Sequence, residues 1–331
     1  MAAPALDVVG IGNAIVDVIA RTDDAFLARH ELKKGAMQLI DAVRAEALYA
    51  AMGPGMEMSG GSAGNTMAGI ASLGGKGAYI GKVRDDELGR VFAHDMRAIG
   101  VRFETPPLKD GPPTARSLIL VTPDAQRTMN TYLGACVDLG PEDVPEALIA
   151  SAQVTYLEGY LFDPPRAKAA FRKAADAAHA AGRKVSLTLS DAFCVERYRA
   201  EFCALIAGHV DILFANEAEI GALYETRDFD SALRAVRGQC EIAALTRSEK
   251  GSMVVTAEET HAIAAARIDK LVDTTGAGDL YASGFLFGLT HGRALPVCGR
   301  LGSLAAGEVI SHYGARPEVS LRELAAKAGL L

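Results

Sequence analysis

The stretch Val272–Gly288, VDTTGAGDLYASGFLFG, places two glycines and a carboxylate at the start of an apolar segment. The segment has one apolar helical face, formed by Leu280, Phe285, Leu286 and Leu289. A glycine-rich helix start leaves backbone N–H groups free, and together with the positive end of the helix dipole they make a site for an anion. Asp279 is unexpected there, because a carboxylate repels an anion. It is either an ordinary acid of a first helical turn or a residue with a chemical task.

Composition narrows the class of protein. The chain has 331 residues, half of them apolar, and 34 basic against 41 acidic side chains give a net charge of −7. No basic tract is present, so we expect no nucleic-acid partner. The cysteines have no C-x-x-C pair, so we expect free, scattered thiols rather than disulfides or a zinc site. The five are Cys136, Cys194, Cys203, Cys240 and Cys298.

The N-terminus and the hydropathy pattern predict where the protein works. The first ten residues, MAAPALDVVG, contain no lysine or arginine and lead into a strand-like segment. They do not resemble a signal peptide, and no apolar run approaches membrane-spanning length. We therefore expect a soluble, cytoplasmic protein without a membrane partner.

Strand-like and helix-like segments alternate along most of the chain. Strands are predicted at 7–20, 77–83, 154–160, 184–190, 210–216 and 241–247. Helices are predicted at 62–75, 86–100 and 164–182. This alternation is typical of an α/β fold with a mostly parallel sheet and helices on both faces. We expect one domain over residues 1–331.

Two regions, about 14–41 and 101–135, show strands without intervening helices. They are expected to pair as a small antiparallel sheet that forms a lid over a site. The site itself is expected at the carboxyl ends of the parallel strands, where polar residues gather. Two phosphate-binding motifs are excluded, because Ile15 replaces the third glycine of a dinucleotide fingerprint and Val83 replaces the Ser or Thr of a P-loop.

Taken together, the motifs resemble the ribokinase family of small-molecule kinases and, within it, the adenosine kinases. The segments 59–89 (SGGSAGNTMAGIASLGGKGAYIGKVRDDELG) and 273–288 (DTTGAGDLYASGFLFG) are similar to the two glycine signatures of the family. Softer similarity to adenosine kinases lies in GNAIVDV, DDAFLARHELKKGAMQL, LSDAF and VDILFANEAE. The resemblance implies a ribokinase-like three-layer sandwich with a small β-sheet lid.

The resemblance also explains Asp279. Phosphoryl transfer requires stabilisation of charge on the moving group and a positioned nucleophile. The N–H groups of Gly276, Ala277 and Gly278 would form the anion hole, and Asp279 would act as general base for the acceptor hydroxyl. Arg127 matches the lid arginine that reaches the transferring phosphate, although a solvated hairpin charge is an equally good interpretation of it.

The acceptor site follows from the same resemblance. Asp17 would bind two neighbouring hydroxyls of a ribose, with Asn65 and the backbone of Gly60 and Gly61 completing the clamp. The remaining residues that match a nucleoside pocket are Asn13, Gln38, Ser62, Leu133, Ala135 and Phe193. For Leu133, Ala135 and Phe193 ordinary core packing is an open alternative.

The donor and metal sites are implied as well. Asn216 and Glu219 match an N-x-x-E element that holds Mg²⁺ largely through water. Nucleotide contacts are expected from Asn216, Thr246, Ser248 and Gly251, and a monovalent cation such as K⁺ near Asp273 and Thr275. Ser248 departs from the family, which usually has glycine there, and Leu280-Tyr281 replaces the usual Ala-Phe.

Three functions remain open at this level. The first is ATP-dependent phosphorylation of the 5′-hydroxyl of adenosine to AMP, a purine salvage reaction. The second keeps the chemistry but uses another nucleoside or a sugar such as ribose, fructose or 2-keto-3-deoxygluconate. The third is a binding protein that has lost turnover, which the intact Asp279 and anion hole disfavour. The partners are then ATP and a small acceptor, and the protein is expected to be a monomer or homodimer.

Overall fold

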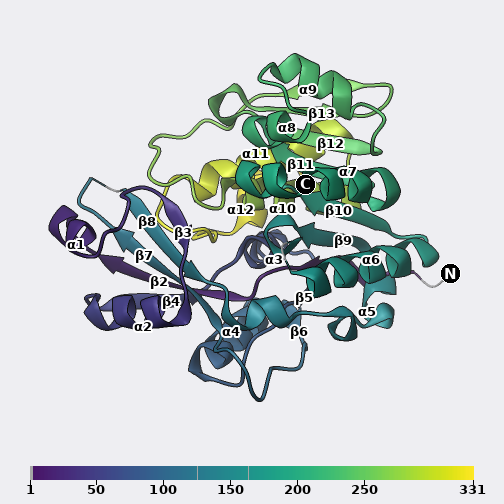
Figure 1. Cartoon of the computed structure of the whole chain (residues 1–331). Coiled ribbons are helices and arrows are strands. Elements are labelled where there is room, and N and C mark those ends of the chain that lie inside the picture. The colour runs from purple at the N-terminus through teal and green to yellow at the C-terminus, as the bar shows by residue number, and fades with distance from the viewer. Residues whose placement is uncertain (1–2, 125, 163) are drawn as a thin grey trace.

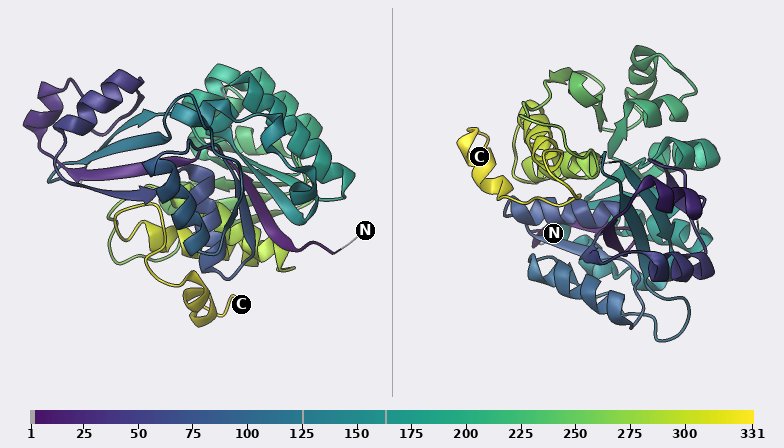
Figure 2. Two further views of the ribbon diagram at one scale, coloured as in Figure 1. Left: turned by 90° about the horizontal axis from the view of Figure 1, so that it is seen from below. Right: turned by 90° about the vertical axis from the view of Figure 1, so that its left-hand side faces the viewer.

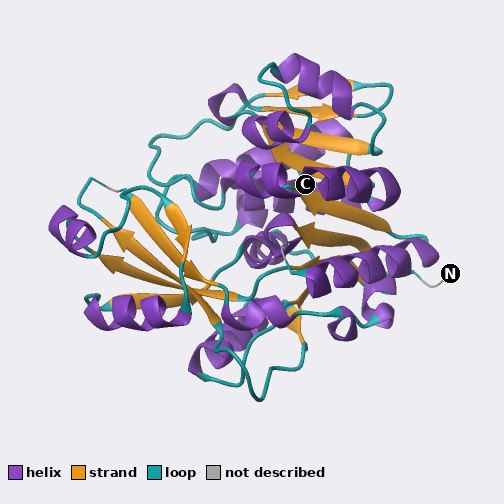
Figure 3. Ribbon diagram, viewed as in Figure 1, coloured by secondary structure: helices purple, strands orange, loops and turns teal. Residues whose placement is uncertain are grey.

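Two sheets of different size organise the chain. The computed structural model describes residues 3–124, 126–162 and 164–331. A nine-stranded sheet forms the body, and a five-stranded sheet stands at one end of it (Figures 1 and 3). The predicted α/β class is confirmed, with a large, mostly parallel sheet and a smaller second sheet, which is the arrangement that the resemblance implies.

The large sheet is parallel over most of its width. Its strand order is β14-β13-β12-β11-β10-β9-β1-β5-β6, with only β13 and β14 antiparallel to their neighbours. The strands are β1 Leu6–Ile11, β5 Gly77–Ile80, β6 Arg102–Phe103, β9 Ala152–Glu158, β10 Lys184–Thr188, β11 Ile212–Asn216, β12 Ile242–Thr246, β13 Ser252–Val255 and β14 Thr260–Ile263.

Helices cover both faces of this sheet and bury two separate apolar clusters. In β1, Val8 packs into one cluster and Val9 and Ile11 into the other, because alternate side chains of a strand point to opposite faces. One layer contains α3 Ser62–Ser72, α4 Glu87–Ala98, α10 Ala277–Thr290, α11 Leu295–Val309 and α12 Leu321–Lys327. The other contains α5 Glu146–Ala150, α6 Pro165–Ala180, α7 Ala192–His209, α8 Glu217–Leu223 and α9 Phe229–Val236.

The small sheet differs from the predicted lid in three ways. It is mixed rather than antiparallel, since β2 runs parallel to β7 and β3 parallel to β8. It also takes in β4, which lies outside the predicted ranges, whereas β6 joins the large sheet. Its strands, in order, are β3 Met37–Leu39, β8 Arg127–Tyr132, β7 Ala115–Val121, β2 Ile15–Arg21 and β4 Gly55–Ser59.

Two helices, α1 Asp24–Arg29 and α2 Ala42–Ala51, cover one face of the small sheet through a third apolar cluster that includes Val18, Leu48 and Leu118. The sequence pattern did not predict α1, because a helix of six residues is too short to show a helical period. Figure 2 shows this sheet and its helices projecting from the layered body. Neither helix covers the other face of the small sheet, which is the free face of the lid.

The predicted strand at 7–20 is two strands. β1 ends at Ile11 in the large sheet, and β2 begins at Ile15 in the small one. The chain changes sheets at residues 12–14, next to the point where β1 is flanked by β5 on one side and β9 on the other. Such a reversal of strand order opens a crevice at the carboxyl ends of the strands.

Two expectations from composition can be compared with the structure. No helix in the described ranges is long and apolar enough to cross a membrane. Among the cysteines, Cys136 and Cys298 are buried thiols, whereas Cys203 is an exposed one. The cytoplasmic location remains a prediction.

The helices α3 and α10 approach each other closely through small residues. A methyl group on Gly69 would overlap the side chains of Ser283 and Leu280 on α10. This contact brings the N-termini of the two helices together at the crevice.

We predict that Gly69→Ala lowers the free energy of unfolding by about 1–3 kcal/mol, because the added methyl forces two packed helices apart. Chemical denaturation measures this. Gly208→Ala in α7 is the matched control, since a methyl there meets no neighbouring atom and should be neutral or stabilising by up to about 1 kcal/mol. Equal stability of the two variants would contradict the packing described.

Candidate functional site

The buried carboxylate of Glu158 connects three elements at the crevice. Asn13 follows β1 and donates from Nδ2 to Oε1 of Glu158, the last residue of β9, at 2.8 Å. The other oxygen of Glu158 accepts the N–H of Ala63 in the first turn of α3, also at 2.8 Å. Both side chains are buried. Glu158 therefore fixes Asn13 and the start of α3 to the switch point of the sheet.

Asp279 sits in the first turn of α10 and is held by α3. Its Oδ1 accepts the hydroxyl of Ser62 at 2.6 Å, and its Oδ2 accepts Nδ2 of Asn65 at 3.0 Å. Burial raises the pKa of Asp279, while the bonds from Ser62 and Asn65 and the charge of Arg316 oppose that rise. The structure thus brings three predicted site residues into direct contact.

The glycine turn has the form expected of an anion site. Gly276 has φ 77°, a left-handed conformation that favours glycine, and its Cα packs against Ala315. The N–H of Ala277 closes the turn by donating to the Thr274 carbonyl at 3.3 Å. For Gly276 and Gly278 no such backbone bond occurs within the described residues. Two of the three predicted donors are therefore free, and Ala277 is partly occupied.

Asp17 approaches the site from the lid. It lies on β2 and packs on Gly60, where a methyl group would overlap its carboxylate. Burial raises the pKa of Asp17 to about 6, partly offset by the charges of Arg127 and Arg316, whereas Asp279 raises it further. The N–H of Gly60 is used by the Ile15 carbonyl at 2.8 Å, and Gly61 packs on the Asn13 carbonyl. Asn65 points its amide at Asp279.

Arg127 connects the lid to the turn before α10. Its Nη1 forms an ion pair with Oδ2 of Asp273, and both side chains are buried. The same carboxylate accepts the N–H of Gly314 at 3.1 Å and both the N–H and hydroxyl of Thr275, at 3.0 and 2.8 Å. Arg127 is thus not a solvated hairpin charge.

The predicted monovalent cation does not fit the side chain of Asp273. Four donors, one of them a guanidinium, surround its two oxygens. A cation there would have to displace Arg127, so K⁺ has no part in the chemistry proposed below.

Gln38, a predicted pocket residue, lies on the face of the small sheet that α1 and α2 cover. The register pairs Gln38 with Asn130, and Asn130 with Leu118, whose side chain belongs to the cluster under α1 and α2. Gln38 donates to Oδ1 of Asn130 at 2.7 Å on that covered face. The structure therefore does not bring Gln38 to Asp17, because strand alternation places the two side chains on opposite faces of the small sheet.

The other proposed pocket residues have mixed environments. Ala135 is fully buried, so ordinary packing accounts for it. Leu133 is half-buried where the chain leaves β8. Phe193, in the first turn of α7 beyond β10, is 69% exposed. An aromatic ring that is open to solvent at the carboxyl edge of the sheet is available to a ligand.

Asn216 and Glu219 form a capping box at the start of α8. The side-chain Oδ1 of Asn216 accepts the N–H of Glu219 at 2.9 Å, and the Glu219 carboxylate accepts the N–H and Nδ2 of Asn216 at 2.9 and 2.6 Å. Within the described ranges no three His, Cys, Asp or Glu side chains cluster as a metal site. The residues fit Mg²⁺ held mainly through its waters, because this ion keeps its hydration shell and takes few carboxylates.

The donor loop follows β12. Thr246 ends that strand opposite Ser252, and Gly251 packs against the Ile263 carbonyl. Ser248 has φ 52°, a left-handed conformation in which glycine is the usual residue. This explains the departure noted in the sequence: the backbone keeps the shape although the side chain differs. Tyr281, the other departure, bonds to Ser252 through its hydroxyl at 2.8 Å.

Carboxylates dominate the electrostatics of the crevice. Burial raises the pKa of both Glu158 and Glu219 to about 7, and Asp279 adds repulsion to each. With Asp17 and Asp279 they make four acids whose charges oppose one another. Such a cluster is typical of a site that handles protons or binds cationic groups.

Sequence reasoning missed two residues here, Glu158 and Arg316. Glu158 ends a strand at the predicted ligand-binding edge, which is a usable signal. Arg316 lies in a loop, and its guanidinium reaches Asn65, with Nε 3.4 Å from Oδ1. Nothing in the local sequence indicates that contact, because it joins residues 251 positions apart.

Comparison with known proteins agrees with this geometry. The family model for pfkB family carbohydrate kinases matches residues 37–321. The adenosine kinase of Sinorhizobium meliloti is 60% identical, with a TM-score of 0.92 over 98% of this chain and 99% of that one. A probable sugar kinase of Rhizobium etli CFN 42 is 56% identical, with a TM-score of 0.94 over 99% and 100%. An ATP-dependent ribose-1-phosphate kinase of Halopiger xanaduensis is 31% identical over 76% of this chain and 81% of its own.

We predict that Gly278→Ala separates folding from phosphoryl transfer. Gly278 is exposed in the first turn of α10, and a methyl there meets no protein atom, so stability should be unchanged or rise by up to about 1 kcal/mol. The same methyl would displace a phosphate bound to the turn, with a loss of about 10²-fold in kcat for phosphoryl transfer from ATP. A folded variant with the wild-type kcat would place the phosphate elsewhere.

Proposed function

The chain belongs to the pfkB family of carbohydrate kinases, and we propose that it phosphorylates the 5′-hydroxyl of adenosine with ATP to give AMP. That it is a phosphotransferase with an alcohol group as acceptor is shown by the family and by its similarity to kinases. The choice of adenosine is the proposed part.

The observation that carries the choice is the free face of the lid. The register puts Met37, Leu39 and Met56 on the same face as Asp17, and they are 47%, 56% and 61% exposed. A patch of exposed apolar side chains beside polar groups marks a binding surface. Methionine adapts to flat aromatic surfaces. A purine ring suits this face, whereas the hydroxyls of a free sugar would be left without partners there.

The polar groups around Asp17 then bind the ribose. We propose that the Asp17 carboxylate accepts hydrogen bonds from the two ring hydroxyls, with Gly61 nearby. Its closeness to Gly60 supports this, because the absence of a side chain at that position leaves the carboxylate open. The 5′-hydroxyl would replace Ser62 as the hydroxyl donor to Asp279, whose Oδ1 already accepts such a bond at 2.6 Å.

Asp279 is the proposed general base. It takes the proton of the acceptor hydroxyl while that oxygen attacks the γ-phosphorus and the bond to ADP breaks. The free N–H groups of Gly276 and Gly278 stabilise the charge that develops on the transferred group. Arg127 forms an ion pair with Asp273. We propose that its guanidinium leaves Asp273 and binds the phosphoryl group when ATP is present.

Asn216 and Glu219 are the residues proposed to hold Mg²⁺, and Thr246, Ser248 and Gly251 the donor nucleotide. The metal, when bound, neutralises charge on the phosphates of ATP. Burial raises the pKa of Glu219 to about 7. A cation bound nearby would lower that pKa and favour the ionised carboxylate.

A sugar acceptor is the second candidate. It is favoured by the 31% identity to a ribose-1-phosphate kinase and the 56% identity to a probable sugar kinase. Both candidates use the same base and anion hole, and they differ in what the lid covers.

We predict that the purified protein phosphorylates adenosine with kcat/KM at least about tenfold above ribose or fructose, because the lid face gains apolar contact only with a base. ATP consumption measured across nucleosides, pentoses, hexoses and 2-keto-3-deoxygluconate tests this. Met37→Ser should lower kcat/KM for adenosine but not for a free sugar, and Val43→Ser on the outer α2 is the control. Faster turnover of a free sugar would reject adenosine and leave the kinase assignment intact.

A further inference from the structure

The loop between α11 and α12 delivers a guanidinium to the crevice. Arg316 extends towards α3, where its Nε lies 3.4 Å from Oδ1 of Asn65 and its Nη2 lies 3.6 Å from the sulfur of Met96. Within the ranges that the structure describes, no carboxylate forms an ion pair with it at contact distance. Its charge instead interacts with the carboxylates of Asp17, Asp95 and Asp279.

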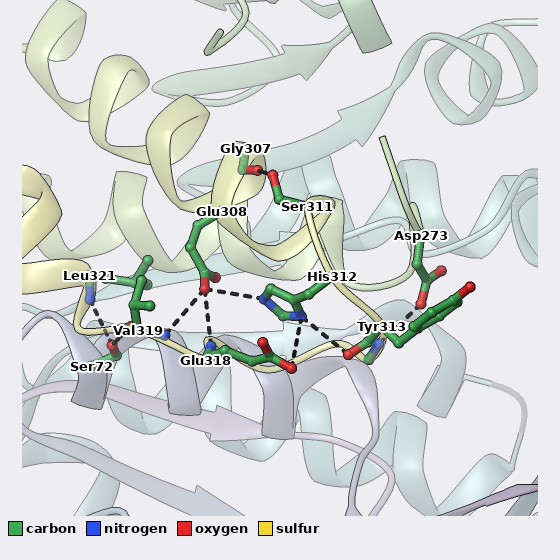
Figure 4. Close-up of polar contacts among 11 residues, drawn as sticks. Ser72, Asp273, Gly307, Glu308, Ser311, His312, Tyr313, Glu318, Val319 and Leu321 are labelled. Atoms are coloured by element: carbon green, nitrogen blue, oxygen red, sulfur yellow. Dashed lines mark hydrogen bonds and ion pairs between the residues drawn. The ribbon is translucent and has the colours of Figure 1, made fainter. Parts of the chain in front are cut away.

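The loop is anchored on both sides of Arg316, as Figure 4 shows. Oε1 of Glu308, near the end of α11, accepts the N–H groups of Glu318 and Val319 at 3.0 and 3.3 Å and lies 3.1 Å from Nε2 of His312. Gly314 donates to Asp273. Leu321 donates to the hydroxyl of Ser72 at 3.0 Å.

These anchors make Arg316 a fixed charge rather than a mobile one. Pro317 follows it and restricts its backbone to extended conformations. A side chain that extends from a backbone held in this way has fewer positions open to it when it contacts its neighbours.

The contact with Asn65 has a direct consequence for Asp279. Since Oδ1 of Asn65 faces the Arg316 Nε, its Nδ2 is left to donate to Asp279, at 3.0 Å. Rotating the amide by half a turn would set donor against donor at Arg316 and oxygen against oxygen at Asp279. Arg316 therefore selects the orientation in which Asn65 supports the carboxylate.

We propose that Arg316 is a positioning residue for phosphoryl transfer: it fixes the Asn65 amide against Asp279 and supplies the positive charge that faces both Asp279 and Asp17. The inference rests on the proposed role of Asp279 as general base. Arg127 cannot take its place in this state, because it is paired with Asp273.

Among the other groups around Asp279, the two uncharged donors lower its pKa as Arg316 does, whereas the acids and phenols repel its charge. Ser62 and Asn65 donate to it from α3. The acids that share its field are Asp17 of β2, Glu158 of β9 and Glu219 of α8, and the phenols are Tyr156 and Tyr160. Arg316 is the cation that acts on Asp279 among these groups.

The test compares the pH dependence of kcat/KM for wild type, Arg316→Met, Arg316→Gln and Arg316→Lys, using the acceptor that the panel shows to be fastest. Loss of the charge raises the pKa of Asp279, so the pH below which kcat/KM falls should move upward by about one unit in the Met and Gln variants. Arg316→Lys keeps the charge and should stay near wild type in that pH. Arg90→Met, at an exposed arginine on α4, is the matched control.

Two uncharged variants, Arg316→Met and Arg316→Gln, are compared because either substitution can impair folding. Thermal unfolding shows which variants are folded, and only those are interpreted. An unmoved acid limb in a folded neutral variant would overturn the inference. Asp279→Asn in the same assay distinguishes failure of the inference about Arg316 from failure of the proposed role of Asp279 as general base. If that variant is inactive while the Arg316 variants match wild type, only the inference fails. If it keeps the wild-type kcat, the proposed base fails and the inference with it.

Discussion

The close packing of α3 on α10 is the constraint on which the site depends. Gly69 leaves no room for a methyl between the helices, and their N-termini meet where Ser62 and Asn65 donate to Asp279. The large sheet holds both helices on one face, and Glu158 fixes the start of α3 to β9. A helix terminus that offers free N–H groups is thus placed beside a carboxylate that is already oriented.

This arrangement also brings four acidic side chains close together. Asp17, Glu158, Glu219 and Asp279 share one crevice, and burial raises the pKa of each. Because the acids are stabilised in their protonated forms, their contribution to folding stability is present at low pH and is lost as the pH rises through about 6 to 7. Two arginines, the buried Arg127 of the lid and the half-buried Arg316 of the loop after α11, offset part of the repulsion. Substrate phosphates with their metal would bring further charges of both signs.

The sequence predicted the layered body well, because alternating strands and helices have clear hydrophobic periods. The resemblance implied Asp279 as the base, Asn65 in the ribose clamp with Asp17 and Ser62 in the nucleoside pocket. In the structure both Ser62 and Asn65 donate to Asp279. The sequence did not predict the mixed pairing of the lid, since β3 has three residues and α1 six, too few for a periodic signal. It also did not predict that Gln38 lies on the face opposite Asp17, because one residue of register decides which face of a strand a side chain occupies.

The contacts that sequence reasoning missed all join distant parts of the chain. Glu158 is a strand end whose partners lie 95 and 145 positions away, and Arg316 reaches Asn65 across 251. The pairing of Arg127 with Asp273 spans 146 positions. None of these leaves a local pattern, so only the folded chain reveals them. They are also the contacts that set the charges in the site.

The most direct test of this account is the titration of Asp279 itself. With the carboxyl carbons of aspartate labelled by ¹³C, the signal absent from Asp279→Asn identifies the residue, and its chemical shift against pH gives the pKa. Because the carboxylate is withdrawn from water between α3 and α10, the account predicts a pKa clearly above the value of about 3.9 for free aspartate. A pKa at or below that value would contradict a half-buried base held by α3.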